Sequence, residues 1–428
     1  MSKNVFAGIG ISYNDNAAQA GKEAVEMAIK NSGNTPDFGV VYVAGKKYRE
    51  NEKNIKILVE NVHKTFITSN PSVEWIGCTT AGILSNYGHT ENCVVAMTVK
   101  SEFIHTSVGI GDNVSKNPIK AGETAINAAL SKLEVDEYLN SYVRYLAIKK
   151  KTPKELIKTY PYAVIVLFPG AVQGYPGFES DVLNGITKVV GGHIPIVGGS
   201  AGDDFDFTQT YQFANGVVYK NAVVLLAQTY DVLTDIGVAH GFVPTDKNVV
   251  VTNAKGKLVS AFNNKSAIKT YSELVNVPIE QILGVKAAWV GVEYPFGMRD
   301  LVGDYWVKSP QAGIDDSLMF FANIPKDAIM TLMKPDIKLT VTAGGKATET
   351  KDKKKLPVAT FVFDCGGRKT CLKKDTKKEC DEIIKSVKNT PFIGFYTYGE
   401  VGFSYATPPN FVNGTIVAFK ITDKLVME

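Results

Sequence analysis

The chain has 428 residues, of which 45% are hydrophobic, 21% charged and 10% aromatic. This is the composition of an ordinary globular protein, and it excludes the collagen-like, disordered and coiled-coil classes. The formal net charge is +4, and residues 351–378 alone carry ten basic and three acidic side chains. We therefore expect no nucleic-acid partner, because such a partner requires a wide basic face.

The first predicted element is a short strand at residues 5–11, a stretch of seven apolar residues that includes two glycines. This stretch is too weak for a signal peptide, and the longest apolar runs of the chain have six residues, against about 18–20 for a membrane span. The five cysteines are odd in number and widely spread, at Cys78, Cys93, Cys365, Cys371 and Cys380. Such spacing argues against a disulfide scaffold. We expect a cytoplasmic protein without membrane insertion.

From residue 38 onward, one pattern occurs three times: a strand, a helix, a second strand, a glycine-containing loop and a third strand. The first copy has a strand at 38–44, a helix at 51–66, a strand at 73–76, a loop at 77–82 and a strand at 93–99. The second copy has these elements at 162–168, 179–190, 194–197, 198–202 and 221–228. The third has them at 361–363, 375–387, 392–395, 398–402 and 415–421. Three glycine loops at the same joint predict a structural repeat.

The alternation of short strands with helices predicts a mixed α/β (α+β) fold, in which helices cover the sheets on at least one face. The first two copies lie before residue 229 and the third after it, so we expect two domains, at residues 1–229 and 230–428. Residues 118–133 are predicted to form a helix, and residues 137–160 a lysine-rich helical insertion. Residues 336–357 are polar and rich in Gly, Thr and Lys, which predicts an exposed hairpin or insertion.

A first candidate for chemistry is Gly198-x-Ser200-x-Gly202, which matches the nucleophile elbow of α/β-hydrolases. The elbow requires a helix directly after the serine, and the sequence from Asp203 onward is a poor helix start. His240 is the only later histidine, so the order of a catalytic triad is also missing. The alternative is a tight turn whose glycines let the backbone approach another group closely.

A second candidate is Cys365, which ends a predicted strand and precedes Gly366-Gly367-Arg368. A nearby guanidinium and a helix start would lower the pKa of its thiol. The alternative is a small, half-buried residue at the end of a strand. The spacing of Cys365, Cys371 and Cys380 fits no usual zinc or iron–sulfur pattern, so we expect no metal site.

Only four of the 47 basic residues are arginines: Arg49, Arg144, Arg299 and Arg368. Arg299 and Arg368 each lie near a glycine and a carboxylate, and a planar guanidinium binds a carboxylate through two parallel hydrogen bonds. Three acidic residues in the same motifs could hold an ammonium: Asp203, Asp300 and Glu400. Together they would suit a zwitterion such as an amino acid. The alternative is a structural arginine–aspartate pair that bridges two loops.

Taken together, these motifs resemble the FIST family. The loops at 77–82 and 197–203 are similar to those of the FIST N domain, which assigns residues 1–229 to a FIST N-like domain. The motifs at 297–300, 365–368 and 394–400 resemble the FIST C domain, which assigns residues 230–428 to a FIST C-like domain. The resemblance covers roughly residues 5–420. It implies a sensory, ligand-binding module of signal transduction, for which amino acids are suggested ligands.

The resemblance implies a protein that binds an amino acid or similar small carboxylate and signals in trans through a partner, such as a histidine kinase or cyclase. The alternatives are a haem-binding nitric oxide sensor, with one histidine as axial ligand, and an enzyme that uses Cys365 or Ser200. Otherwise no cofactor and no catalytic residue are expected. The predicted ligand-binding residues are Thr79, Thr80, Gly199, Ser200, Asp203, Arg299, Asp300, Cys365, Gly366, Arg368 and Glu400.

Overall fold

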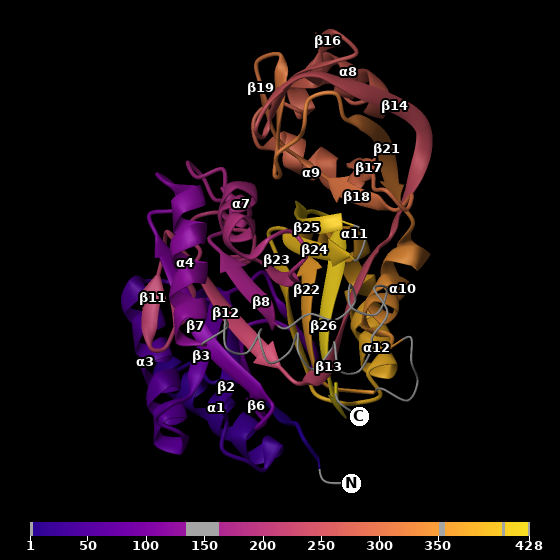
Figure 1. Ribbon diagram of the computed structural model, residues 1–428. Coiled ribbons are helices and arrows are strands. Elements are labelled where there is room, and N and C mark those ends of the chain that lie inside the picture. Colours follow the sequence, from indigo (N-terminus) through magenta and orange to yellow (C-terminus); the bar gives the residue numbers. More distant parts are fainter. Residues whose placement is uncertain (1–2, 134–161, 351–355, 405–406, 427–428) are drawn as a thin grey trace.

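The computed structural model describes residues 3–133, 162–350, 356–404 and 407–426 (Figure 1). Three similar units and one inserted subdomain make up this part of the chain. The first unit contains β1 (Phe6–Ser12), α1 (Ala17–Ser32), β2 (Phe38–Ala44), α2 (Lys46–Arg49), α3 (Glu52–Ser69), β3 (Glu74–Thr79), β4 (Ile83–Ser85), β5 (Gly88–Thr90) and β6 (Cys93–Lys100). The second contains β7 (Ile104–Asp112), α4 (Pro118–Lys132), β8 (Tyr162–Phe168), α7 (Glu179–Val190), β9 (Ile196–Ser200), β10 (Gln212–Ala214), β11 (Val217–Tyr219) and β12 (Ala222–Tyr230).

The third unit begins with β13 (Val232–His240) and resumes after the inserted subdomain. It continues with α10 (Ile337–Thr348), β22 (Pro357–Cys365), α11 (Gly366–Leu372), α12 (Thr376–Ser386), β23 (Phe392–Thr397), β24 (Glu400–Ser404), β25 (Thr407–Val412) and β26 (Thr415–Leu425). The inserted subdomain contains β14 (Phe242–Lys255), β15 (Leu258–Phe262), β16 (Lys265–Ser266), α8 (Ala267–Val275), α9 (Lys286–Glu293), β17 (Phe296–Arg299), β18 (Tyr305–Lys308), β19 (Pro310–Ile314), β20 (Ser317–Phe320) and β21 (Ile329–Pro335).

Each unit contributes four long strands to one sheet, and these strands have the same order in all three. The orders are β1-β6-β2-β3, β7-β12-β8-β9 and β13-β26-β22-β23. Each sheet is completed by a hairpin from another unit: β10 and β11 join β3, β24 and β25 join β9, and β4 and β5 join β23. The hairpins are therefore exchanged in a closed cycle, so every sheet contains strands from two units.

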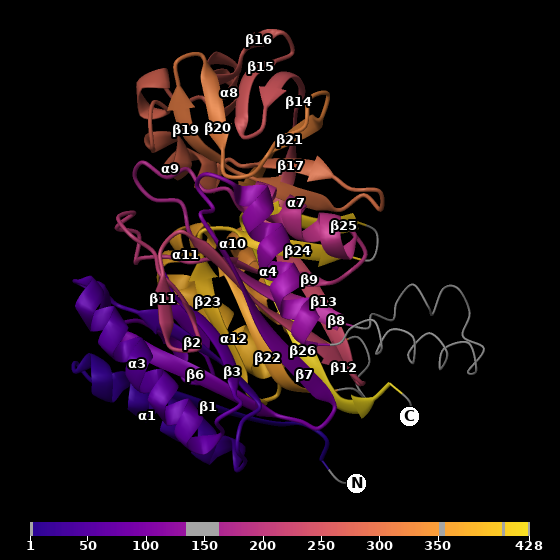
Figure 2. The ribbon, with the colours of Figure 1, turned by 60° about the vertical axis from the view of Figure 1, so that its left-hand side comes forward.

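The inner faces of the three sheets meet in one central core, and helices cover their outer faces (Figures 1 and 2). On β2, for example, Val40 and Tyr42 face the central core, whereas Val41 and Val43 face α1 and α3. In the same way, α4 and α7 pack on the outer face of the second sheet, and α10 and α12 pack on the outer face of the third. Since the strands are buried on both faces, they are apolar throughout rather than alternating.

The first helix of each unit lies very close to its first strand, and glycines make this possible. A Cβ atom at Gly10 would come within 2.2 Å of the Ala24 carbonyl oxygen, and one at Gly111 within 1.9 Å of that of Ala121. Both glycines belong to a Gly-Ile-Gly sequence in the first strand of their unit. The repeated sequence thus marks the same close contact between strand and helix.

The inserted subdomain, residues 242–335, lies between β13 and α10 and forms the upper body in Figure 1. Its strands form a separate sheet in the order β18-β17-β21-β14-β15-β20-β19, and its own apolar core includes side chains of α8 and α9. The chain enters and leaves it at neighbouring points, since the Asp336 N–H donates to the Gly241 carbonyl at 2.8 Å. The subdomain is therefore attached to the third unit by two adjacent strands.

The mixed α/β class with helix-covered sheets is confirmed, as is the helix expected at 118–133. The exposed hairpin or insertion expected at 336–357 is wrong, because α10 occupies most of this range. Asp336 caps the helix by accepting the Leu339 N–H at 2.9 Å, and Ala343 and Ala347 are buried against the sheet. Small residues form the buried face, whereas the large apolar residues Ile337, Leu339 and Val341 lie outside it, so the sequence lacks the apolar period that marks a helix. The insertion expected at 137–160 lies outside the described residues.

The domain limits expected at 1–229 and 230–428 fall at the end of β12, next to the start of β13. They remain a prediction. No helix in the described ranges is long and apolar enough to cross a membrane.

The central core yields a test of how tightly the three units are coupled. Phe395 of the third unit lies 4.4 Å from Tyr42 of the first unit, measured between ring centroids. We expect Phe395→Ala to lower the free energy of unfolding by roughly 3–5 kcal/mol, because it leaves a cavity between units. Urea denaturation followed by near-UV circular dichroism measures this loss. Tyr13→Ala, at a side chain 55% exposed, is the control; equal midpoints for both variants would contradict the shared core.

Candidate functional site

Eight of the eleven predicted ligand-binding residues gather where the three glycine loops meet, at one end of the central core. We call this region, residues 77–82, 198–203 and 397–402 with 365–366, the apical junction. Each loop is hydrogen-bonded to the other two through the backbone. The Ala81 N–H donates to the Tyr396 carbonyl at 3.1 Å, and the Gly202 N–H donates to the Thr79 carbonyl at 2.9 Å. The third contact, from the Ser200 N–H to the Gly399 carbonyl, measures 2.9 Å.

Thr79, Thr80 and Gly199 are packed into this junction. The Thr79 hydroxyl accepts the Tyr211 N–H at 3.0 Å, and the Thr80 carbonyl accepts the Asp204 N–H at 3.3 Å. Both threonines are fully buried or nearly so. A Cβ atom at Gly199 would lie 2.6 Å from the Thr397 side chain. These three residues therefore join the loops to one another.

Asp203 is buried, and its carboxylate binds its own loop. It accepts the N–H groups of Phe207, Thr208 and Gln209 at 3.0, 2.7 and 3.0 Å. The Tyr398 hydroxyl also donates to it at 2.6 Å. Four such donors use the acceptor capacity of one carboxylate. The ammonium site expected at Asp203 therefore has no acceptor left for a ligand.

Arg49 holds the same loop from outside. Its guanidinium donates to the Asp203 carbonyl at 2.6 Å and to the carboxylates of Asp204 and Asp206 at 3.0 and 2.9 Å. The backbone φ is positive at Asp204, Phe205 and Phe207. This conformation is unfavourable for residues other than glycine and persists only where surrounding contacts impose it. Arg49, to which the sequence assigned no role, supplies three of those contacts.

Ser200 ends β9, and a turn rather than a helix follows it. Its buried hydroxyl donates to Glu179 at 3.1 Å, and the second oxygen of Glu179 accepts Lys257 of the inserted subdomain at 3.0 Å. The geometry of a nucleophile elbow is therefore missing at Ser200. Instead, the three side chains connect the second unit to the inserted subdomain.

Cys365 is 8% exposed and lies at the start of α11. Burial raises the pKa of its thiol well above the usual value, and the nearby Glu400 adds to this. The lowered pKa expected from Arg368 is thus wrong, because that guanidinium is bound elsewhere. A Cβ atom at Gly366 would lie 2.9 Å from the Phe205 ring, so this glycine belongs to the packed junction too.

Glu400 is completely buried among threonine side chains. It accepts the hydroxyl of Thr397, and its other oxygen accepts the hydroxyl of Thr415 at 2.9 Å. Burial raises the pKa of the Glu400 carboxyl to about 8. A carboxyl that keeps its proton at neutral pH is a poor partner for an ammonium.

Arg368 lies beneath the junction, fully buried between α10, α11 and α12. Its Nε donates to Asp364 at 2.7 Å, and its Nη2 donates to Glu379 and to the Thr340 carbonyl, the latter at 3.0 Å. Burial raises the pKa of the Asp364 and Glu379 carboxyls, and the positive charge of Arg368 opposes this. This arrangement corresponds to the structural pair that the sequence left open. Arg368 is thus bound inside the fold and does not line the apical junction.

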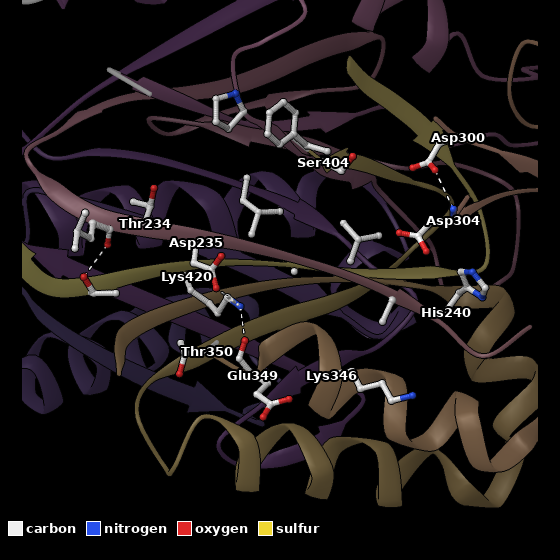
Figure 3. Close-up of a pocket in the computed structure, with 18 of the residues that line it drawn as sticks. Thr234, Asp235, His240, Asp300, Asp304, Lys346, Glu349, Thr350, Ser404 and Lys420 are labelled. Atoms are coloured by element: carbon white, nitrogen blue, oxygen red, sulfur yellow. Dashed lines mark hydrogen bonds and ion pairs between the residues drawn. The ribbon is translucent and has the colours of Figure 1, made fainter. Parts of the chain in front are cut away.

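A cavity of about 870 Å³ lies away from the junction, between β13, α10, β26 and the turn that joins β17 to β18 (Figure 3). We call it the β13 cavity. Its charged lining residues include Asp235, His240, Asp300, Asp304, Lys346 and Lys420. Of the eleven predicted ligand-binding residues, Asp300 lines this cavity. The other charged lining residues were not predicted as ligand-binding residues, because they share no sequence motif.

The charges in the β13 cavity are only partly paired with one another. Lys420 lies 2.8 Å from the Asp235 carboxylate and donates to the Glu349 carbonyl at 2.7 Å. At the other end, Asp300 shapes the turn by accepting the Asp304 N–H at 2.9 Å. The cavity therefore contains an internal ion pair, further carboxylates and the exposed Lys346.

Arg299 adjoins this cavity rather than the apical junction. Its guanidinium lies 5.2 Å from the centre of the Tyr305 ring, and Tyr305 lines the cavity. The structure thus separates the two arginines that the sequence grouped: Arg368 is buried in an ion-pair network, and Arg299 is exposed at the cavity.

The haem alternative can be tested on His240, the histidine that lines the cavity. Its Nδ1 accepts the Phe242 N–H at 3.2 Å. Burial lowers the pKa of His240, and Arg368 contributes to this. With Nδ1 engaged by the backbone, an axial bond from this ring to haem iron would have to form through Nε2. No group of three metal-binding side chains occurs within the described residues.

The different surroundings of the two arginines lead to a stability prediction. We expect Arg368→Lys to lower the free energy of unfolding by about 3–5 kcal/mol, because lysine cannot bind both buried carboxylates. Arg299→Lys, at an exposed site, should change it by less than about 0.5 kcal/mol. Urea denaturation measures both values. A stable Arg368→Lys variant would show that the buried network is dispensable.

The raised pKa of Glu400 predicts a pH dependence. Its folded-state pKa of about 8 lies above the ordinary 4.5, so between these values the folded chain keeps a proton that the unfolded chain has lost. Stability must then fall as the pH rises through this window, by up to about 1.4 kcal/mol per pH unit. Denaturation of Glu400→Gln at pH 5 to 8 should show a flatter profile than the unchanged chain. Glu60→Gln, at an exposed carboxylate, is the control; parallel profiles would refute the assignment.

Comparisons with known proteins concern both the family and the fold. Residues 37–265 match the FIST N domain, and residues 267–403 match the FIST C domain. An uncharacterized protein of Methanocaldococcus jannaschii is 28% identical over 226 residues, which cover 51% of this chain and 43% of that protein. The chain thus spans less than half the length of this relative.

Among solved structures, cyanuric acid hydrolase from A. caulinodans aligns with a TM-score of 0.25 at 11% identity, over 52% of this chain and 70% of that one. PurLQS from Thermotoga maritima aligns with a TM-score of 0.20 at 9% identity, over 98% and 72%. Similarities this low support no argument about fold or function. The two domain matches together cover most of the sequence, and the chain belongs to the FIST family.

Proposed function

We propose that this chain is a cytoplasmic sensory protein whose β13 cavity binds an amino acid or a similar small zwitterion. FIST domains are associated with sensory ligand binding in signal transduction. The observation that supports this site is a cavity of about 870 Å³ whose lining carries charges of both signs. Such a lining matches a ligand that bears an ammonium and a carboxylate.

In this proposal, Asp300 and Asp304 face the ammonium of the ligand. Lys346, which is exposed and has no carboxylate partner among the described residues, faces its carboxylate. Lys420 is less suited to that role, because Asp235 already neutralises it. The rings of Tyr305 and Trp306 line the same cavity and offer an apolar wall to a side chain.

The signal in this proposal is a change in how the inserted subdomain sits on the third unit. The cavity has one wall on each: the β17–β18 turn belongs to the subdomain, whereas β13 and α10 belong to the unit. A ligand that contacts both walls favours the arrangement in which they are close. A partner protein such as a histidine kinase or cyclase then detects that arrangement in trans.

We propose no catalytic step. The Ser200 hydroxyl donates to a carboxylate that is itself bound to Lys257, and burial raises the pKa of the Cys365 thiol. Neither residue lines the β13 cavity. A thiolate or an activated hydroxyl would be required for nucleophilic catalysis.

Thermal denaturation with a panel of the twenty amino acids and common organic acids tests the proposal. At a ligand concentration of about 100 Kd, we expect roughly 2.7 kcal/mol of stabilisation from at least one compound. Asp304→Asn should weaken that response, because it removes a carboxylate from the ammonium end. Asp246→Asn, at an exposed position of the same subdomain outside the cavity, should leave it unchanged. A flat response across the panel would contradict the proposal.

A further inference from the structure

The β13 cavity follows the edge of a strand rather than one of its faces. Every residue from Val232 to His240 lines it. Successive side chains of a strand point to opposite faces, so a cavity bordered by all nine residues must run along the strand's edge. β13 is the outermost strand of its sheet in the described part of the chain, and β26 pairs with its other edge. The cavity therefore faces backbone groups that have no strand partner among the described residues.

The equivalent strands of the other two units differ in this respect. Side chains reach the backbone of β1, where the Ile9 carbonyl accepts Asn31 at 2.8 Å and Tyr87 at 3.2 Å. On β7, the Val108 N–H donates to Glu74 at 3.2 Å. On β13, the Leu233 carbonyl accepts the Thr422 hydroxyl at 2.8 Å, but no described side chain donates to or accepts from the backbone between residues 234 and 239. In the described ranges, β13 therefore combines a largely unbound backbone edge with a cavity of about 870 Å³.

We propose that the β13 cavity binds a short peptide in extended conformation, which pairs with β13 as an added antiparallel strand. This inference rests on one part of the proposed function, the β13 cavity as the ligand site, and names another ligand class for it: a peptide, rather than one amino acid. In an antiparallel pair, alternate residues exchange both their N–H and C=O groups with the partner strand. Addition of a strand to a sheet edge is a general mode of peptide recognition, in which the backbone supplies affinity.

The charges determine the direction of the bound peptide. Asp300 and Asp304 lie at the His240 end of β13, which is the carboxyl end of the strand (Figure 3). A free amino terminus placed there runs antiparallel to β13. The nine residues of β13 span about 30 Å at roughly 3.3 Å per residue, a length that accommodates a peptide of six residues. Lys346 and the Asp235–Lys420 pair then lie along its course.

Hydrogen exchange on the full chain tests this pairing directly. The probe is an equimolar pool of hexapeptides with free amino termini, and the control is the same pool with N-methyl groups on alternate residues. We expect the first pool to slow amide exchange at least tenfold at residues 234–239, with no change in β1 or β7. The N-methylated pool, which lacks half of the donors, should protect these residues at least tenfold less. Equal protection by both pools, or protection outside β13, would overturn the proposal.

The direction of the peptide has its own test. Acetylation of the amino termini should weaken binding of the pool at least tenfold, and Asp304→Asn should abolish this difference between free and acetylated peptides. Asp246→Asn is the matched control and should keep it. A chain that binds both pools equally well has no amino-terminal preference, and the antiparallel assignment fails.

The outcomes separate this inference from the proposed function. If single amino acids stabilise the chain while peptides protect nothing in β13, the peptide inference is wrong and the proposed function stands. If peptides protect β13 while single amino acids have no effect, the peptide inference stands and the amino-acid ligand is refuted. If neither ligand acts, both are refuted.

Discussion

The structure depends on one constraint, which is that no unit can complete its own sheet. Each sheet obtains its last two strands from a neighbouring unit, so backbone hydrogen bonds close a cycle that passes through all three. The shared apolar core and the contact between the three glycine loops follow from this cycle. Since the hairpins arrive at one side of each sheet, the opposite edge is left to the first strand of each unit. The apical junction and the edge of β13 that faces the cavity therefore lie in separate parts of the molecule.

The repeat could be predicted from the sequence because each copy carries local signals: apolar strands, an amphipathic helix and a loop that contains glycine. Hairpin exchange could not be predicted, because β4, β10 and β24 pair with strands far away in the sequence. The candidate site could be predicted only in part, because its contacts also join residues far apart in the sequence. The glycines identified the loop residues, but they did not show whether a polar side chain there already has a hydrogen-bond partner in the fold. Asp203 and Arg368 looked available in the sequence, whereas the fold supplies both with buried partners.

The scarcity of arginine has a geometric explanation at two positions. Arg49 and Arg368 each bind three acceptors that lie in different directions, which suits a guanidinium with five donors and not the single ammonium of lysine. Each of them connects segments that lie apart in the sequence: Arg49 binds the loop at Asp203, and Arg368 binds the Thr340 carbonyl of α10. The third described arginine, Arg299, stacks on an aromatic ring at the surface. Arg144 lies outside the described residues.

The inserted subdomain breaks the threefold similarity of the units at a single connection. In the first two units a short turn joins the first strand to its helix, whereas in the third this turn is replaced by residues 242–335. The chain enters and leaves the inserted subdomain at adjacent points, which are joined by a hydrogen bond from the Asp336 N–H to the Gly241 carbonyl. The three-unit body therefore needs nothing from the insertion to close its sheets. Sequence changes in the insertion can therefore remodel one wall of the β13 cavity while the body that supports it is left intact.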